Sequence, residues 1–283
     1  MYFAVASGGT VLAQTEAQKQ SQAAPKSNFD QGVAAWKASN YSLAKQKLNA
    51  ACYTDGVKEG CFNLGVMFEE GGGVPIDLKT AYNLFSKACV MNYGAACYNA
   101  GLFEALGKVE TKDQKAAENY FRKACDLNFA KGCSNYGSFL HAGTAGTKNL
   151  VQARSLFKKA CDLKDDTGCF NLALYMRDGV GGSPDHPAAR TVLKPLCDRG
   201  HIKACHEYGV FLTSGLGGPV DHVTAFKAFE KACSANNNIS CRSLGILYQN
   251  GEGVAASATE SKKFFKKACD LGDSTACGVI GQK

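Results

Sequence analysis

Paired cysteines recur along this 283-residue chain at a nearly constant interval. The gaps between the second cysteines of successive pairs are all 36 residues. The gaps between the first cysteines are also 36 residues, except for one gap of 37. The first cysteines are Cys52, Cys89, Cys125, Cys161, Cys197, Cys233 and Cys269, and the second are Cys61, Cys97, Cys133, Cys169, Cys205, Cys241 and Cys277. Self-similarity with a period of about 20 to 50 residues is typical of solenoids, whose units bury apolar surface only against their neighbours. The spacing therefore predicts one repeat array, although the length alone would suggest two domains.

The first half of each unit is predicted to be a helix around the second cysteine. The recurring motif Cys-x-Asn-Leu-Gly, as at Cys61 to Gly65, places residues 61, 64, 65 and 68 on one helical face. This helix is predicted to end at a glycine, because glycine accepts the left-handed conformation that closes a last turn. All six complete copies carry that glycine, as Gly71, Gly107, Gly143, Gly179, Gly215 and Gly251.

The second half of each unit is predicted to be a helix that ends at the first cysteine. Its N-cap is a side chain that accepts hydrogen bonds from free backbone N–H groups. These caps are Asp77, Asp113, Asn149, Asp185, Asp221 and Ser257. An apolar stripe at i, i+3, i+4 and i+7, such as Ala81 to Ala88, faces the core, where Phe85 and its counterparts fill the space between hairpins. Pro187 and Pro195 predict a kinked or shortened helix in one copy.

The two ends of the chain depart from the repeat. Residues 28–52 are predicted to form a degenerate first hairpin, with Asn40 as the cap of its second helix. Residues 276–281 begin a final helix that covers the last exposed face. Residues 28–281 are thus predicted to form one repeat domain, whereas residues 1–27 are interpreted as a residual secretion signal and a flexible leader.

The composition places the chain in an oxidising compartment. Fourteen cysteines are an even number and exceed what a cytosolic enzyme of this size needs. The spacing C-x7-C is neither the C-x2-C zinc pattern nor the C-x-x-C redox motif, so structural disulfides are favoured over metal or redox sites. A mean hydropathy of −0.18 and the lack of a long apolar run predict no membrane span.

The repeat resembles the Sel1-like branch of the tetratricopeptide superfamily and, within it, the Helicobacter cysteine-rich (Hcp) family. The resemblance covers residues 28–281 and rests on segments such as Phe157 to Leu163 (FKKACDL) and Gly168 to Leu172 (GCFNL). It implies an all-α, right-handed superhelix of seven αα-hairpins in a periplasmic or secreted protein, with one disulfide per unit. The implied pairs are 52–61, 89–97, 125–133, 161–169, 197–205, 233–241 and 269–277. Oxidative folding machinery is then an expected partner.

A β-lactam activity is the alternative that the resemblance brings, because some Hcp-like proteins are described as penicillin-binding proteins or β-lactamases. A serine β-lactamase needs Ser-x-x-Lys together with Ser-Asp-Asn and Lys-Thr-Gly motifs. Ser42-x-x-Lys45 and Ser155-x-x-Lys158 occur here, but neither partner motif does. Incidental helical spacing explains both, and we predict no catalytic residue.

Metal, cofactor and nucleic-acid binding are not predicted. The five histidines form no H-x-H or H-E-x-x-H pair, and Cys205, beside His201 and His206, already belongs to the repeat. Lys158-Lys159 and Lys266-Lys267 fall in the last turn of a helix, where positive charge complements the helix dipole. No aromatic residues interleave with basic ones as a nucleic-acid surface would require.

Protein or peptide binding is the predicted function. In such solenoids the cysteine-starting helix lines the concave side, where an extended segment can lie. Asn63, Asn99, Asn135 and Asn171 would offer amide donors and acceptors at equal intervals to a peptide backbone. Hydrogen bonding of these amides within the helix pair remains equally open. The protein is expected to be a monomer that acts as an adaptor, or as a scaffold for assembling an envelope or respiratory complex.

Overall fold

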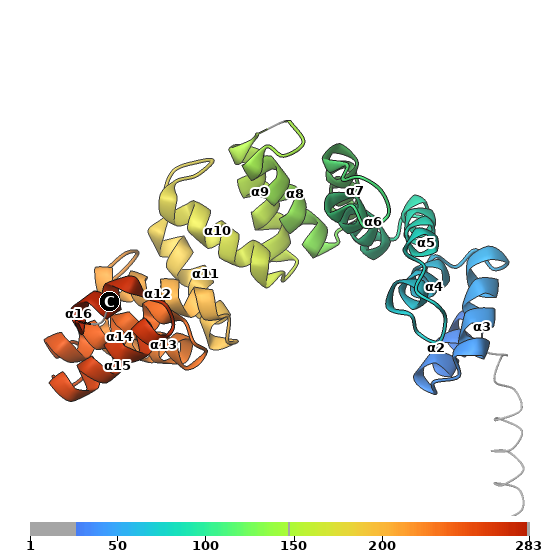
Figure 1. The fold of residues 1–283 in the computed structure, drawn as a ribbon. Coiled ribbons are helices and arrows are strands. Elements are labelled where there is room, and N and C mark those ends of the chain that lie inside the picture. Colours follow the sequence, from blue (N-terminus) through green and yellow to red (C-terminus); the bar gives the residue numbers. More distant parts are fainter. Residues whose placement is uncertain (1–26, 147, 282–283) are drawn as a thin grey trace, which may run out of the picture. The chain divides into compact units, whose positions relative to one another are not determined.

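The computed structural model describes residues 27–146 and 148–281, and every regular element in these ranges is an α-helix (Figure 1). The chain divides into two compact units, Met1–Met91 and Asn92–Lys283. The first unit contains α2 (Asn28–Lys37), α3 (Tyr41–Tyr53), α4 (Lys58–Glu70) and α5 (Leu78–Val90). The second contains α6 (Gly94–Leu106), α7 (Gln114–Asp126), α8 (Ala130–Ala142), α9 (Leu150–Asp162), α10 (Asp166–Asp178), α11 (His186–Asp198), α12 (Ile202–Ser214), α13 (His222–Ser234), α14 (Asn238–Asn250), α15 (Ala258–Asp270) and α16 (Ser274–Val279).

Consecutive helices pack as hairpins, which confirms the predicted all-α repeat architecture. We call the even-numbered helices α4 to α14 the A helices and the odd-numbered helices α5 to α15 the B helices. The degenerate first hairpin is α2 with α3, and α16 is the final helix. The predicted leader lies outside the described residues except for Ser27, whose side chain accepts a hydrogen bond from the Asp30 N–H and so caps α2. The single repeat domain over residues 28–281 stays a prediction.

Helix ends lie where the sequence predicts them, because the C-terminal glycines and the N-cap side chains each act within a few residues of the chain. The six repeated glycines follow the A helices with φ between 65° and 74°, a left-handed conformation that strains other residues. All six predicted N-caps of the B helices accept a hydrogen bond from the backbone N–H three residues later.

Five hairpins in the described ranges pair a glycine on the A helix with a phenylalanine on the B helix. A Cβ atom placed on this glycine would lie 2.5–3.0 Å from the nearest ring atom of the phenylalanine. The pairs are Gly65 with Phe85, Gly101 with Phe121, Gly137 with Phe157, Gly209 with Phe229 and Gly245 with Phe265. The hairpin of α10 and α11 has Ala173 and Leu193 at these two positions instead, so the larger residue on one helix accompanies the smaller one on the other.

Disulfides join the end of one hairpin to the start of the next, which confirms a solenoid stapled by disulfides. The described bonds are Cys52–Cys61, Cys125–Cys133, Cys161–Cys169, Cys197–Cys205, Cys233–Cys241 and Cys269–Cys277. Cys89 and Cys97 are disulfide-bonded as well, and no cysteine in the described ranges is free. Each bond therefore restrains the short corner at which two hairpins meet.

A lysine two residues before the first cysteine links successive B helices in the second unit. Lys159 Nζ donates to the carbonyl oxygen of Cys125 at 2.7 Å, thirty-four residues earlier in the chain. Lys231 and Lys267 donate in the same way to Cys197 and Cys233, at 2.7 and 3.0 Å. These lysines thus bind the carbonyl end of the preceding B helix, in addition to the favourable charge at the end of their own helix.

Pro195 stands at this lysine position in α11. Proline does not shorten this helix, because α11 has 13 residues like its neighbours, and the alternative of a kink stays a prediction. Pro187 lies in the first turn, where no intrahelical N–H bond is needed. What Pro195 removes is the lysine link, since proline cannot reach the carbonyl oxygen of Cys161. Cys161 is half-buried, whereas Cys125 and Cys197 are buried.

Candidate functional site

The A helices of the second unit present one common face to solvent. Positions two and five after each second cysteine lie one helical turn apart on this face. We call this surface the A face and define it by Asn99, Leu102, Asn135, Ser138, Asn171, Leu174, Glu207, Val210, Ser243 and Ile246. Because α8 contacts both α6 and α10, three A helices lie side by side along it (Figure 1).

The predicted asparagines are half-buried and unpaired. Within the described ranges, the structure records no hydrogen bond from the side chains of Asn99, Asn135 or Asn171 in the second unit, or of Asn63 in the first. Each amide therefore keeps two donors and one acceptor oxygen for a ligand. The alternative of hydrogen bonding within the helix pair finds no support in this geometry.

We call the position two residues after each second cysteine the asparagine column. Towards the C-terminus this column contains Glu207 and Ser243, whose side chains form bonds within the chain. Glu207 Oε2 accepts from Arg177 Nη1 at 2.5 Å, and Ser243 Oγ donates to the carbonyl oxygen of Ile239 at 3.0 Å. Side chains at these two positions are committed within the chain. In the second unit the free polar groups at this position therefore belong to α6, α8 and α10.

Two hollows open between α8 and α10, and each is lined by one asparagine of the column. The first, which we call the polar hollow, has a volume of about 250 Å³ and is lined by Tyr98, Lys131, Ser134, Asn135, Asp165 and Thr167. The second, the aromatic hollow, has a volume of about 280 Å³ and is lined by Ser138, His141, Phe157, Asn171, Leu174, Tyr175, Asp178 and Val180. Sequence reasoning selected the two asparagines but did not predict either hollow.

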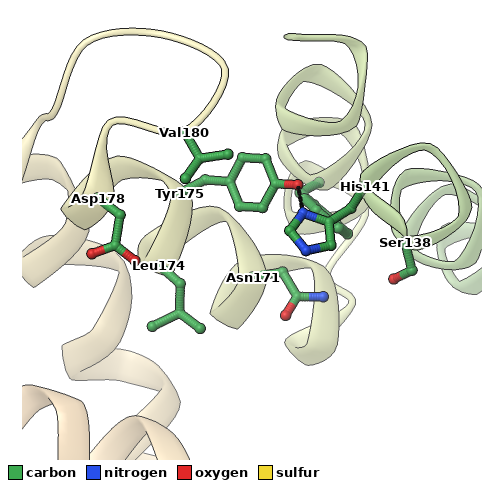
Figure 2. Close-up of a pocket in the computed structure, with 8 residues that line it drawn as sticks. Ser138, His141, Asn171, Leu174, Tyr175, Asp178 and Val180 are labelled. Carbon is green, nitrogen blue, oxygen red and sulfur yellow. Dashed lines mark hydrogen bonds between the residues drawn. The ribbon is translucent and has the colours of Figure 1, made fainter. Parts of the chain in front are cut away.

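The aromatic hollow is built on a ring contact between α8 and α10. Figure 2 shows Tyr175 reaching from α10 towards His141 on α8, and a hydrogen bond of 2.6 Å joins its hydroxyl oxygen to His141 Nδ1. The Tyr175 ring also packs edge-on against Phe157 at a centroid distance of 5.1 Å. Burial raises the pKa of Tyr175, so its hydroxyl stays neutral at physiological pH.

The edge of the aromatic hollow carries negative charge. Arg177 pairs with both oxygens of Asp178, at 2.7 and 2.9 Å, and with Glu207. Its hydrogen bond holds the pKa of Asp178 below the usual value, so this carboxylate stays ionised. One guanidinium therefore pairs with two carboxylates, which leaves a net charge of about −1 at the edge of the aromatic hollow.

The two Ser-x-x-Lys spacings do not bring a nucleophile to a base. Ser155 Oγ donates to the carbonyl oxygen of Val151 at 3.3 Å, and Lys158 forms an ion pair with Asp162. Ser42 is exposed, and Lys45 lies 5.4 Å from the ring centroid of Phe68. Both spacings are explained by ordinary helix surfaces.

We expect Ser155→Ala and Ser42→Ala to leave any hydrolysis of nitrocefin unchanged, because neither hydroxyl is activated by a neighbouring base. The measurement is initial-rate absorbance with the oxidised full-length protein, and heat-treated protein gives the background rate. A loss of at least about a hundredfold in a folded variant, equal to about 2.7 kcal/mol in the barrier, would contradict this account.

The loosely clustered histidines have structural partners. His201 Nδ1 accepts from the Ala204 N–H and caps α12, while His206 Nδ1 lies 3.0 Å from Ser240 Oγ. Burial lowers the pKa of His206, which favours its neutral form. In the part of the chain that the structure describes, no three histidine, cysteine or acidic side chains gather where they could hold a metal ion. The same part contains no helix long and apolar enough for a membrane span.

A family model for the Sel1 repeat matches residues 58–93, 94–129, 130–165, 167–201, 202–237 and 239–273. A putative β-lactamase of Helicobacter pylori, HcpE, is 48% identical over 46 residues, which are 16% of this chain and 13% of that protein. Cytochrome c oxidase assembly factor 7 of Xenopus tropicalis is 41% identical over 51 residues, which are 18% of this chain and 22% of that protein. The chain thus spans less than a quarter of the length of either relative.

A solved structure shows the same fold over most of the chain. A protective antigen of uropathogenic Escherichia coli strains superposes with a TM-score of 0.84 and 23% sequence identity. The superposition covers 90% of this chain and 55% of the antigen. At this identity the likeness concerns the repeat architecture alone.

Proposed function

Because the chain belongs to the Sel1 repeat family, whose repeats generally mediate protein–protein interaction, we propose that it is an extracytoplasmic adaptor that binds an extended protein or peptide segment along the A face. The observation that carries this proposal is the row of half-buried, unpaired amides of Asn99, Asn135 and Asn171. A peptide backbone presents N–H and C=O groups that can pair with such amides. Asn135 lines the polar hollow and Asn171 lines the aromatic hollow.

The disulfides support a location outside the cytoplasm. Disulfides form and persist in oxidising compartments, and every described cysteine is bonded. We place the protein in the periplasm or among secreted proteins, with oxidative folding machinery as a transient partner. We infer that it acts as a monomer, because within each unit the hairpins already pack against their neighbours in the same chain.

The other two candidate functions differ in what supports them. A β-lactam activity is suggested by the name of a relative that shares 46 aligned residues, and no activated serine supports it. Assembly of a respiratory or envelope complex agrees with the name of the second relative. That role differs from adaptor function only in the identity of the partner, so the same surface would serve both.

We expect Asn135→Ala with Asn171→Ala to weaken peptide binding by about 1–3 kcal/mol, or roughly five- to 150-fold in Kd, because each amide loses hydrogen bonds to the ligand. Peptides are first selected from a random library on the oxidised full-length chain, and titration calorimetry then gives Kd. The matched control is Asn119→Ala on the B helix α7, outside the A face, where the exposed amide accepts a hydrogen bond from Arg122 of its own helix.

The folding of the double variant separates the two roles of these amides. Neither asparagine lies in the apolar stripe, so the melting temperature should change little. A double variant that melts much earlier but binds normally once folded would overturn the proposal and would make the amides structural. Unchanged binding and unchanged melting would also overturn it.

A further inference from the structure

Three departures from the repeat meet at the aromatic hollow. The position five residues after the second cysteine is Val66, Leu102, Leu174, Val210 and Ile246 in five copies, but Ser138 on α8. The position six residues after the cysteine is tyrosine only at Tyr175, in a column that reads Met67, Phe103, Phe139, Tyr175, Phe211 and Leu247. The position eight residues after the cysteine is histidine only at His141. All three side chains line one cavity, although they come from two different copies.

Ser138 leaves the hollow open. A branched aliphatic side chain occupies this position in the other copies, and the serine side chain is smaller by one or two non-hydrogen atoms. The Ser138 hydroxyl donates to the carbonyl oxygen of Ser134 at 2.9 Å, within its own helix, so it does not fill the space. Figure 2 shows Ser138 and His141 on one side of the space and Asn171 and Leu174 on the other.

The floor and volume of the hollow suit an aromatic side chain. Phe157 and Tyr175 are almost fully buried and hold their rings at 73° to one another, while His141 adds a third ring. Aromatic rings favour edge-on and offset contacts of this kind, which add to the stabilisation from buried area. A cavity of about 150 Å³ accommodates benzene, so about 280 Å³ leaves room for a phenol or an indole.

The rim of the hollow favours a positive charge beside that ring. Asp178 and Glu207 share the single guanidinium of Arg177, and Asp178 lines the hollow itself. About half of the Asp178 side chain is exposed, so an incoming basic side chain can approach it. Charge complementarity of this kind acts mainly on partner choice and association rate.

We propose that the aromatic hollow is the specificity pocket of the A face, and that it takes an aromatic side chain of the bound segment with a lysine or arginine next to it. This inference rests on the proposed peptide binding. Asn171, which lines the same hollow, holds the backbone of the segment at the anchor residue. No other pair of neighbouring copies combines a serine, a tyrosine and a histidine at these three positions.

The first test fills the hollow with the residue that the repeat itself carries. In Ser138→Leu a leucine side chain occupies the cavity, and we expect Kd for the selected peptides to rise at least tenfold. The matched control is Val66→Leu at the same repeat position on α4, which is not part of the A face, and Kd should stay within about twofold. The melting temperature of Ser138→Leu should not fall, because leucine already stands at this position on α6 and α10. Ser138→Val replaces it if the leucine variant does not fold.

The second test reads the ligand. Selected peptides should share a phenylalanine, tyrosine or tryptophan with a neighbouring basic residue, and alanine at the aromatic position should weaken binding at least tenfold. A photoreactive benzoyl-phenylalanine at that position should crosslink to α8 or α10. Alanine at the basic residue should weaken binding to the native chain about threefold, and it should have no effect on Asp178→Asn.

The outcomes separate this inference from the proposed function. If Asn135→Ala with Asn171→Ala weakens binding and Ser138→Leu does not, peptide binding stands and the specificity pocket is overturned. Selected peptides with aliphatic anchors or acidic neighbours overturn the pocket in the same way. If neither variant weakens binding, or if the library gives no binder, both proposals fail together.

Discussion

Gly209→Ala should destabilise the second unit, lowering the free energy of unfolding by about 1–3 kcal/mol. A Cβ atom on residue 209 would lie 2.5 Å from Cε1 of Phe229, closer than two carbon atoms can approach. Only 2% of Phe229 is exposed, so the ring cannot swing into solvent. The two helices of the hairpin must therefore move apart. Chemical denaturation followed by circular dichroism measures the effect.

The natural pair Ala173 and Leu193 indicates how the loss can be recovered. In Gly209→Ala with Phe229→Leu, the smaller leucine vacates the space that the new methyl group needs, so the double variant should be more stable than Gly209→Ala alone. A double-mutant cycle should then give a coupling of about 1–2 kcal/mol. Gly278→Ala is the control, because a Cβ there meets no atom within 4 Å. Equal losses for residues 209 and 278 would contradict this description of the core.

Removal of an interior disulfide should have a comparable effect. The Cys125–Cys133 bond closes a loop of nine residues, for which the chain-entropy model gives about 2.5 kcal/mol. Both cysteines are almost fully buried, so alanine at the two positions introduces no buried polar group. We expect Cys125→Ala with Cys133→Ala to melt several degrees lower than the native chain, measured by differential scanning calorimetry under oxidising conditions.

The terminal bond provides the comparison. Cys269–Cys277 attaches only the six-residue α16, so alanine at these positions should affect the end of the array and little else. In a repeat protein, stability is a sum of unit and interface contributions, and an interior interface supports neighbours on both sides. A similar fall in melting temperature for the two variants would show that each disulfide stabilises the chain independently of its place in the array.

Features set within a few residues were predictable from the sequence. Gly71 and its counterparts, and Asp77 and its counterparts, act on the helix end to which they belong, so a single copy was enough to place them. Repetition then fixed the hairpin order. The stripe from Ala81 to Ala88 was equally accessible, because helical periodicity depends only on spacing along one helix.

The aromatic hollow was not predictable in the same way. It depends on lateral packing between α8 and α10, which brings His141 and Tyr175 together across 34 residues. Averaging the copies into one motif also hides Ser138, because its importance lies in differing from Leu102 and Leu174. A column-by-column comparison would have marked all three departures. The lysine links were missed for a related reason, since a carbonyl at the end of the preceding B helix leaves no mark in the sequence.

The missing lysine link at Pro195 affects the local stability of the array. In a repeat array each interface between neighbouring hairpins contributes its own share of the stability, so the loss of one link weakens the interface that it spans. Between α9 and α11 the lysine link to the carbonyl oxygen of Cys161 is missing, whereas the Cys161–Cys169 disulfide still joins the two hairpins. We expect backbone amides of α10 and α11 to exchange hydrogen for deuterium before those of α8 and α13. The two hairpins would then separate more easily here while the Cys161–Cys169 bond keeps them attached, next to the hollow that we propose as the specificity pocket.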